Sequence, residues 1–112
     1  MQILETQHTQ YTTLSPSGDL DANSSVFLDE KISGLLQEGH ANIHIDGSGI
    51  TYISSAGLGV FISHLKEIEG KGGKFVLTHL SENVHDVFTI LGLTKLDALV
   101  ILDDATAVEK EF

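Results

Sequence analysis

The sequence predicts an α/β domain built on a mixed, mostly parallel β-sheet with amphipathic helices. Short runs rich in β-branched and apolar residues alternate along the chain with stretches whose apolar residues recur at helical spacing. Glycine, serine and aspartate separate the two kinds of segment, as is typical of turns and helix starts. The chain of 112 residues is long enough for one domain with a modest core, so residues 1–112 are expected to form a single unit.

The N-terminal third of the chain predicts two strands and a helix. Residues 2–8 and residues 10–15 contain β-formers, and the short connection between them favours an antiparallel pair. Ser15-Pro16-Ser17-Gly18 is a turn signal that contains the only proline. A helix is then expected from about residue 22 to residue 37, with Asp21 as its N-cap. Its apolar residues recur at helical spacing and are Leu28, Ile32, Leu35 and Leu36.

The middle of the chain predicts a strand followed by a long helix. Gly39 is expected to end the first helix. Residues 42–46 alternate between isoleucine and polar side chains, which predicts a strand in a sheet with one face better covered than the other. The second helix is expected to begin near Ser55 or Ala56 and to end by Gly70.

The C-terminal part predicts two further strands and two further helices. The strands are expected over residues 74–78 and residues 99–102. Ser81 is the predicted N-cap of a helix between them, and Asp103 is the predicted N-cap of a final short helix that reaches about residue 110. The predicted order is therefore β-β-α-β-α-β-α-β-α, in which crossover helices connect parallel strands.

Composition and charge exclude several classes of function. The net charge of −10 would repel nucleic acid, whose binding depends on Lys and Arg, and it disfavours an anionic membrane surface. No apolar run has the length of a membrane span, and the N-terminal Met-Gln-Ile-Leu-Glu-Thr lacks the features of a signal peptide. The chain has no cysteine, so disulfides and cysteine-ligated metals are excluded and a cytoplasmic location is expected. A partner with a basic face would be attracted to this domain.

Two adjacent serines stand at the start of the second predicted helix and have two interpretations. Ser54 or Ser55 can cap the helix, because a serine hydroxyl accepts a hydrogen bond from a free backbone N–H there. Alternatively, one of them is a phosphorylation site, because the helix N-terminus favours an anion. A phosphate adds about −1.5 to −2 charges, so its main effect is expected on whatever binds this surface. Gly57 and Gly59 are expected to allow close packing of the helix against the sheet.

Four segments resemble a known family. They are Gly18-Asp-Leu-Asp21, Asp46-Gly-Ser-Gly-Ile-Thr-Tyr-Ile-Ser-Ser-Ala-Gly-Leu-Gly59, Gly72-Gly-Lys-Phe-Val76 and Phe88-Thr-Ile-Leu-Gly-Leu93. Together they look like the STAS domain, and more closely the stand-alone bacterial anti-sigma factor antagonists. The resemblance spans essentially the whole chain in the same element order, and it implies a single STAS-type domain.

The resemblance also implies functional residues. The serine that is phosphorylated in the family falls on Ser55 of this chain. The aspartate that usually precedes it falls on Ser54, so the carboxylate beside the acceptor is lost and Ser54 is an alternative acceptor. The Ser/Thr that follows in the family falls on Ala56, and the Asp of its Gly-x-Leu-Asp segment falls on Asp21. The residues implied to bind the partner are Asp21, Ser54, Ser55, Ala56, Gly57 and Leu58.

The mechanism that the resemblance implies is partner switching. The unmodified protein binds an anti-sigma factor that is also a serine kinase, and this frees a sigma factor. The kinase uses Mg-ATP to phosphorylate Ser55, the complex separates, and a serine phosphatase resets the protein. This reading makes the chain a regulatory binding protein rather than an enzyme, with no catalytic residue, cofactor or metal of its own. It requires the Ser55 hydroxyl to be open to solvent.

Alternatives from other classes remain at this stage. The domain would also suit a scaffold in a large signalling assembly or an accessory subunit of a lipid or solute transporter. His40, His44 and Asp46 suggest a metal site, although the spacing supplies no further ligand and surface histidines explain them better. A hydrolytic triad of Ser55, His85 and Asp46 would make the chain an enzyme, but no nucleophile-elbow pattern supports it.

Overall fold

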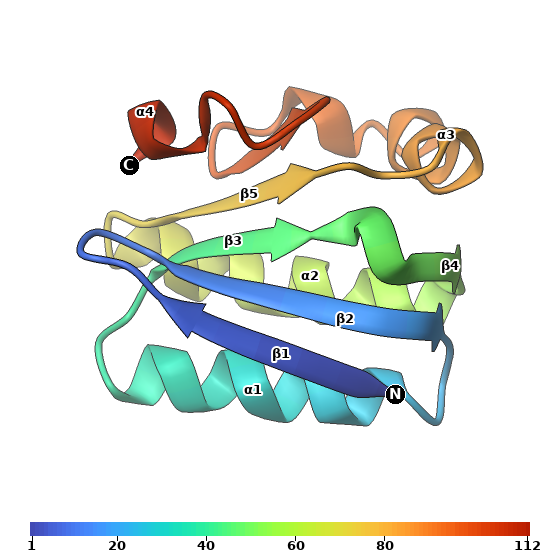
Figure 1. Cartoon of the computed structure of the whole chain (residues 1–112), viewed down its shortest axis with the longest axis horizontal. Helices are drawn as coiled ribbons and strands as arrows, with labels where there is room; N and C mark the ends of the chain where they lie inside the picture. The colour runs from blue at the N-terminus through green and yellow to red at the C-terminus, as the bar shows by residue number, and fades with distance from the viewer.

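A six-stranded sheet forms the centre of the domain, with the strand order β1-β2-β3-β5-β6 and with β4 paired to β2 beyond the end of β3 (Figure 1). The computed structural model describes the backbone of residues 1–112 and the side chains of every residue other than Lys95. The strands are β1 Gln2–Gln7, β2 Thr12–Leu20, β3 Asn42–Asp46, β4 Ile50–Ile53, β5 Lys74–Thr78 and β6 Leu99–Leu102. The helices are α1 Ser25–Gln37, α2 Ser55–Gly70, α3 Glu82–Ile90 and α4 Val108–Glu111, with short 3-10 helices η1 Gly47–Gly49 and η2 Leu93–Lys95.

The pairing of the strands confirms the predicted fold class. β1 and β2 pair antiparallel, whereas β2 pairs in parallel with β3 and β4, and β3, β5 and β6 continue the parallel part. Consecutive parallel strands need crossover connections, and α1, α2 and α3 supply them. Among the described residues no helix combines the length and the apolar character that crossing a bilayer requires.

The main core lies between one face of the sheet and the helices α1 and α2. Ile43 and Ile45 of β3 and Phe75 of β5 are fully buried on this face. Because side chains alternate along a strand and recur every three to four residues along a helix, each element contributes one apolar row. The buried residues of the two helices are Leu28, Ile32, Leu35, Leu36, Leu58, Val60, Phe61 and Ile68.

The second face of the sheet is covered by the C-terminal segment. Val108 of α4 is buried, and the ring of Phe112 stacks on that of Tyr11 with centroids 4.9 Å apart. Lys74 of β5 forms an ion pair with Glu111 at 3.7 Å. As a result His44, expected as a surface histidine, is only 6% exposed.

The structure corrects the prediction of a turn at residues 15–18, because these residues continue β2. Pro16 lies between the part of β2 that pairs with β3, which ends at Leu14, and the part that pairs with β4, which begins at Gly18. Proline has no amide hydrogen, but at this position no hydrogen bond to a parallel neighbouring strand is lost. The register shifts between Gly18 and Asp19, and Gly18 has a φ of 111°, a backbone conformation that favours glycine.

Two helix starts and one strand also differ from the predictions. The N-cap of α1 is Ser24 rather than Asp21, which instead binds the turn that precedes the helix. Asp103 does not cap the final helix, which is a single turn with Ala107 as its N-cap. The strand β4 was absent from the predicted order. The end of α1 is confirmed, because Gly39 has a φ of 87° and the following N–H donates to the Leu35 carbonyl at 2.8 Å.

Candidate functional site

The start of α2 is attached to the end of β2 through Ser54. The Ser54 N–H donates to the carbonyl of Leu20 at 2.9 Å, and its hydroxyl donates to the same carbonyl at 3.2 Å. The Ser54 oxygen also accepts from the N–H of Gly57 at 3.3 Å, which makes Ser54 the N-cap of α2. The predicted capping function therefore belongs to Ser54, whose hydroxyl both donates and accepts within the domain.

Ser55 is the first residue of α2 and is exposed. Its hydroxyl enters no side-chain hydrogen bond with the described residues, in contrast to that of Ser54. The first turn of a helix presents unpaired N–H groups and the positive end of the helix dipole, an environment that favours an anion. Ser55 is therefore not sealed inside the core, as the phosphorylation hypothesis requires.

Close packing behind the serines fixes the position of α2. A Cβ atom on Gly57 would lie 2.7 Å from the carbonyl oxygen of Leu20 and 3.0 Å from a side-chain carbon of Ile53, so only glycine fits there without a shift. Gly59 has open space at the same position, and the predicted packing function of Gly59 is therefore wrong. Leu58, one of the residues implied to bind the partner, is 4% exposed and belongs to the core.

The residues predicted to bind a partner thus divide into two groups. Ser55 and Ala56 are exposed, and Asp21 and Ser54 are partly exposed. Gly57 and Leu58 are buried, so they support this surface from below rather than offering side chains to a partner. We refer to the exposed and partly exposed residues Asp21, Ser54, Ser55 and Ala56 as the helix-start surface.

Within the helix-start surface, Asp21 is held in one orientation. Its Oδ1 accepts from the N–H of Ser24 and the N–H of Asn23, each at 3.0 Å, and from the Ser24 hydroxyl at 3.1 Å. The hydrogen bonds from Ser24, and then that from Asn23, lower the pKa of the Asp21 carboxyl below its ordinary value. Asp21 is therefore ionised at neutral pH, next to Leu20, whose carbonyl holds Ser54.

Sequence reasoning missed a second carboxylate contact in this region. The hydroxyl of Thr51 in β4 donates to Asp19 Oδ1 at 2.5 Å, and Asp19 lies opposite Tyr52 in the pairing of β2 with β4. Tyr52 is 54% exposed. The one signal available was the β-former run at residues 50–53, which predicts a strand but not its partner.

The other predicted constellations are not assembled. Among the described residues, no group of three or more histidine or acidic side chains has a geometry that would hold a metal ion. In the proposed triad, Asp46 accepts from the Ser48 N–H at 3.0 Å, and His85 lies within 3.4 Å of the Thr89 hydroxyl. Neither bonds to Ser55 in the described part of the chain, so the triad interpretation is not supported.

Comparison with protein families identifies the architecture. The family model for the STAS domain matches residues 2–104, which is most of the chain. The chain belongs to the STAS domain family. The helix-start surface is thus formed by a STAS domain, at the junction of β4 and α2.

Individual STAS relatives agree with this assignment. An anti-sigma-B factor antagonist of Bacillus subtilis strain 168 is 36% identical over 77 residues, which cover 69% of this chain and 70% of the relative. A solved Thermotoga maritima protein matches with a TM-score of 0.90 at 24% identity, over 97% of this chain and 92% of its own. The phosphorylated form of the Bacillus cell fate determinant SpoIIAA matches with a TM-score of 0.75 at 20% identity, over 97% of this chain and 98% of SpoIIAA. These two structures show the shared fold.

Proposed function

We propose that this STAS domain is an anti-sigma factor antagonist that is switched by phosphorylation of Ser55. The observation that supports this most directly is the division of labour between the two serines. The Ser54 hydroxyl is engaged with Leu20 and Gly57, whereas the Ser55 hydroxyl is exposed and free of side-chain hydrogen bonds within the described residues. An exposed hydroxyl at a helix start is accessible to a kinase, and the Bacillus subtilis relative is an anti-sigma-B factor antagonist.

The proposed partner is an anti-sigma factor that is also a serine kinase and carries its own Mg-ATP. In the unmodified state it binds the helix-start surface and releases a sigma factor. After phosphoryl transfer to Ser55 the complex separates, and a serine phosphatase restores the unmodified state. The domain itself contributes an acceptor and a surface rather than a catalytic group. SpoIIAA, a protein with the same fold, has a solved phosphorylated form, which supports such a modification here.

The physical basis of the switch is a change of charge at a contact surface. A phosphate adds about −1.5 to −2 charges. Interaction with the helix dipole is worth roughly 0.3–1 kcal/mol and has a favourable sign, so the fold tolerates the modification. A partner that binds across the ionised Asp21 meets a stronger negative field after modification. Burial of such an uncompensated charge costs several kcal/mol, enough to dissociate a complex.

The overall charge suits a partner with a basic face. A net charge of −10 attracts a partner with a basic face and speeds its association. We propose that the kinase presents such a face to the helix-start surface. If the basic groups of the kinase are already paired with Asp21, a phosphate dianion on Ser55 finds no free cation and weakens the complex.

Calorimetric titration with the anti-sigma factor kinase of the same genome tests the proposal. Ser55→Ala should bind as tightly as the unmodified protein, and Ser55→Asp should bind at least about tenfold more weakly, or ~1.4 kcal/mol. Ser63→Asp is the matched control, because it adds the same charge to an exposed serine of α2 roughly 12 Å further along the helix. If both Ser55 variants bind like the unmodified protein, the switch does not reside at Ser55.

A further inference from the structure

A chain of hydrogen-bonded side chains crosses the second face of the sheet and is independent of the helix-start surface. It consists of His8, Thr13, His44, Thr78 and His79. The Thr13 hydroxyl oxygen lies 3.1 Å from His8 Nε2 and 3.0 Å from His44 Nδ1. The Thr78 hydroxyl oxygen lies 2.7 Å from His44 Nε2 and 3.1 Å from His79 Nδ1. We call these five residues the histidine chain.

The strand register produces this arrangement. Thr13 of β2 lies directly opposite His44 of β3, and Thr78 of β5 lies opposite Asp46, two residues further along β3. Because side chains two residues apart share a face, all three project to the second face of the sheet. His44 is 6% exposed and Thr78 is fully buried, whereas His8 and His79 at the two ends are exposed. The partly buried Thr13 and the buried His44 and Thr78 therefore connect two exposed histidines.

The number of hydrogen atoms in the chain limits its possible states. A neutral imidazole donates from one ring nitrogen and accepts at the other, and a hydroxyl has a single hydrogen to donate. The Thr78 hydroxyl is fully buried, and its two side-chain partners among the described residues are His44 and His79. It must therefore accept from one histidine and donate to the other, because a buried unpaired hydroxyl is costly.

We propose that the histidine chain is a relay in which the protonation of His79 sets the tautomer of His44 and, through Thr13, the hydrogen-bonding direction of His8. With His79 neutral and accepting at Nδ1, Thr78 donates to it, and His44 carries its hydrogen on Nε2. Thr13 then donates to His44 Nδ1, and His8 donates to Thr13. A proton on His79 Nδ1 reverses every one of these bonds, so that His44 carries its hydrogen on Nδ1 and His8 accepts.

The groups around the histidine chain favour a proton on His79 over a proton on His44. Asp46 Oδ1 lies 3.6 Å from His79 Nδ1, and Asp104 interacts electrostatically with the same ring. Burial lowers the pKa of His44, with smaller contributions from Asp46, which raises it, and from His79 and His8, which lower it. Burial therefore opposes a charge on His44, so that a proton added at His79 is accommodated by a change of the His44 tautomer. Glu109 and His40 line the same hollows as His8, and the carbonyl of Asp103 accepts from the backbone N–H of His79 at 3.3 Å.

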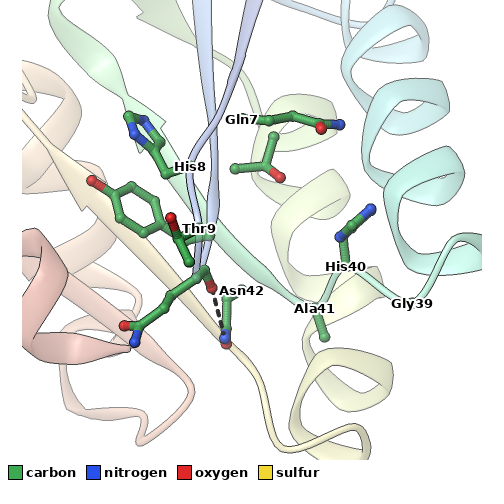
Figure 2. A pocket seen from close by; sticks show the side chains of 10 residues that line it. Gln7, His8, Thr9, Gly39, His40, Ala41 and Asn42 are labelled. Carbon is green, nitrogen blue, oxygen red and sulfur yellow. Dashed lines mark hydrogen bonds between the residues drawn. The ribbon is translucent and has the colours of Figure 1, made fainter.

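At the far end, the relay acts on the hairpin that joins β1 and β2. His8 stacks on Tyr11 with ring centroids 4.3 Å apart, and Tyr11 in turn stacks on Phe112. Figure 2 shows His8 and His40 on opposite sides of a hollow of about 130 Å³, closed below by the bond from Asn42 Nδ2 to the Gln10 carbonyl at 3.2 Å. A proton or a bound group at His79 would therefore change whether His8 donates a hydrogen bond to a ligand in this hollow or accepts one from it.

Two-bond ¹H–¹⁵N NMR of the imidazole rings tests the relay, because it reports which ring nitrogen carries the hydrogen. In the unmodified protein, His44 should change from the Nε2–H form to the Nδ1–H form as His79 is protonated. His79→Asn, which suits the left-handed backbone at this position (φ 57°), should abolish the pH-dependent change at His44. In this variant the hydrogen of His8 that faces Thr13 should stay on Nε2 over the same pH range.

Two further variants separate the relay from a local effect. Thr13→Val keeps the branched shape but removes the hydroxyl, so His44 should still respond to His79 whereas His8 should not. His85→Gln on α3, outside the chain, should change nothing. A single His44 tautomer throughout the titration of the unmodified protein would overturn the proposal without any variant. A tautomer change that persists in folded His79→Asn would overturn it as well.

Discussion

The carbonyl of Leu20 at the end of β2 accepts two hydrogen bonds from Ser54, one from its N–H at 2.9 Å and one from its hydroxyl at 3.2 Å. This contact between residues far apart in the sequence decides which of two adjacent serines serves the fold. Ser54 is committed to the sheet and to the helix cap, and Ser55 is left facing solvent. The proposed switch depends on that separation of tasks.

Substitution of the two serines by alanine should therefore affect stability unequally. Ser54→Ala removes the cap and should lower the free energy of unfolding by roughly 0.5–2 kcal/mol. Ser55→Ala removes an exposed hydroxyl and should change it by less than about 0.5 kcal/mol. Urea unfolding followed by circular dichroism measures both. Equal losses in the two variants would show that both serines cap α2, contrary to the hydrogen bonds of Ser54.

The two glycines of the same turn offer a matched pair. Gly57→Ala places a Cβ atom 2.7 Å from the Leu20 carbonyl oxygen and should cost roughly 1–3 kcal/mol as α2 shifts away from β2. Gly59→Ala has open space and should stabilise the helix by up to about 1 kcal/mol. Thermal unfolding of both variants checks the prediction, and a stabilised Gly57→Ala would contradict the close approach.

Stability should fall on acidification because of His44. Burial lowers the pKa of His44 in the folded state below the ordinary value of 6.5. The unfolded chain therefore binds a proton at this residue before the folded one does, and stability is lost as the pH falls below about 6.5.

His44→Gln removes this titration, so its free energy of unfolding should depend less on pH between about 7.5 and 5.5 than that of the unmodified protein. The measurement is urea unfolding at a series of pH values, with His85→Gln as the control that retains His44. If the free energy of unfolding depends on pH as strongly in His44→Gln as in the control, another group is responsible for the pH dependence.

Asp21 allows the charge of the helix-start surface to be changed without loss of the local turn. In Asp21→Asn the amide oxygen can still accept from the N–H groups of Asn23 and Ser24. We expect the fold to be retained and the affinity for the anti-sigma factor kinase to fall about tenfold, with a weaker dependence on salt. Titration at two ionic strengths measures both quantities, and an unchanged affinity would exclude Asp21 from the contact.

Local patterns predicted most of the fold. The helical spacing of Leu28 and Ile32, the left-handed end at Gly39 and the serine cap at Ser81 each depend on near neighbours in the chain, and each is found in the structure. The errors fall where distant residues decide. Pro16 and Gly18 read as a turn, but they lie in a strand because β3 and β4 pair with different parts of β2.

The same distinction applies to the candidate site. The pattern around Ser54 and Ser55 predicts a helix start, but either serine satisfies it. The carbonyl of Leu20 makes the choice, and that contact spans more than thirty residues of sequence. Likewise the contact of Thr51 with Asp19 and the burial of His44 require knowledge of strand neighbours that alternation alone does not supply.

Intact mass spectrometry after incubation of the protein with the anti-sigma factor kinase and Mg-ATP tests most directly whether Ser55 is the phosphate acceptor. One added phosphate is expected in the unmodified protein and in the control Ser63→Ala, and none in Ser55→Ala. Ser54→Asp, which can still cap α2 through its carboxylate, should also gain one phosphate. Addition of one phosphate to Ser55→Ala would place the acceptor elsewhere and contradict the central claim.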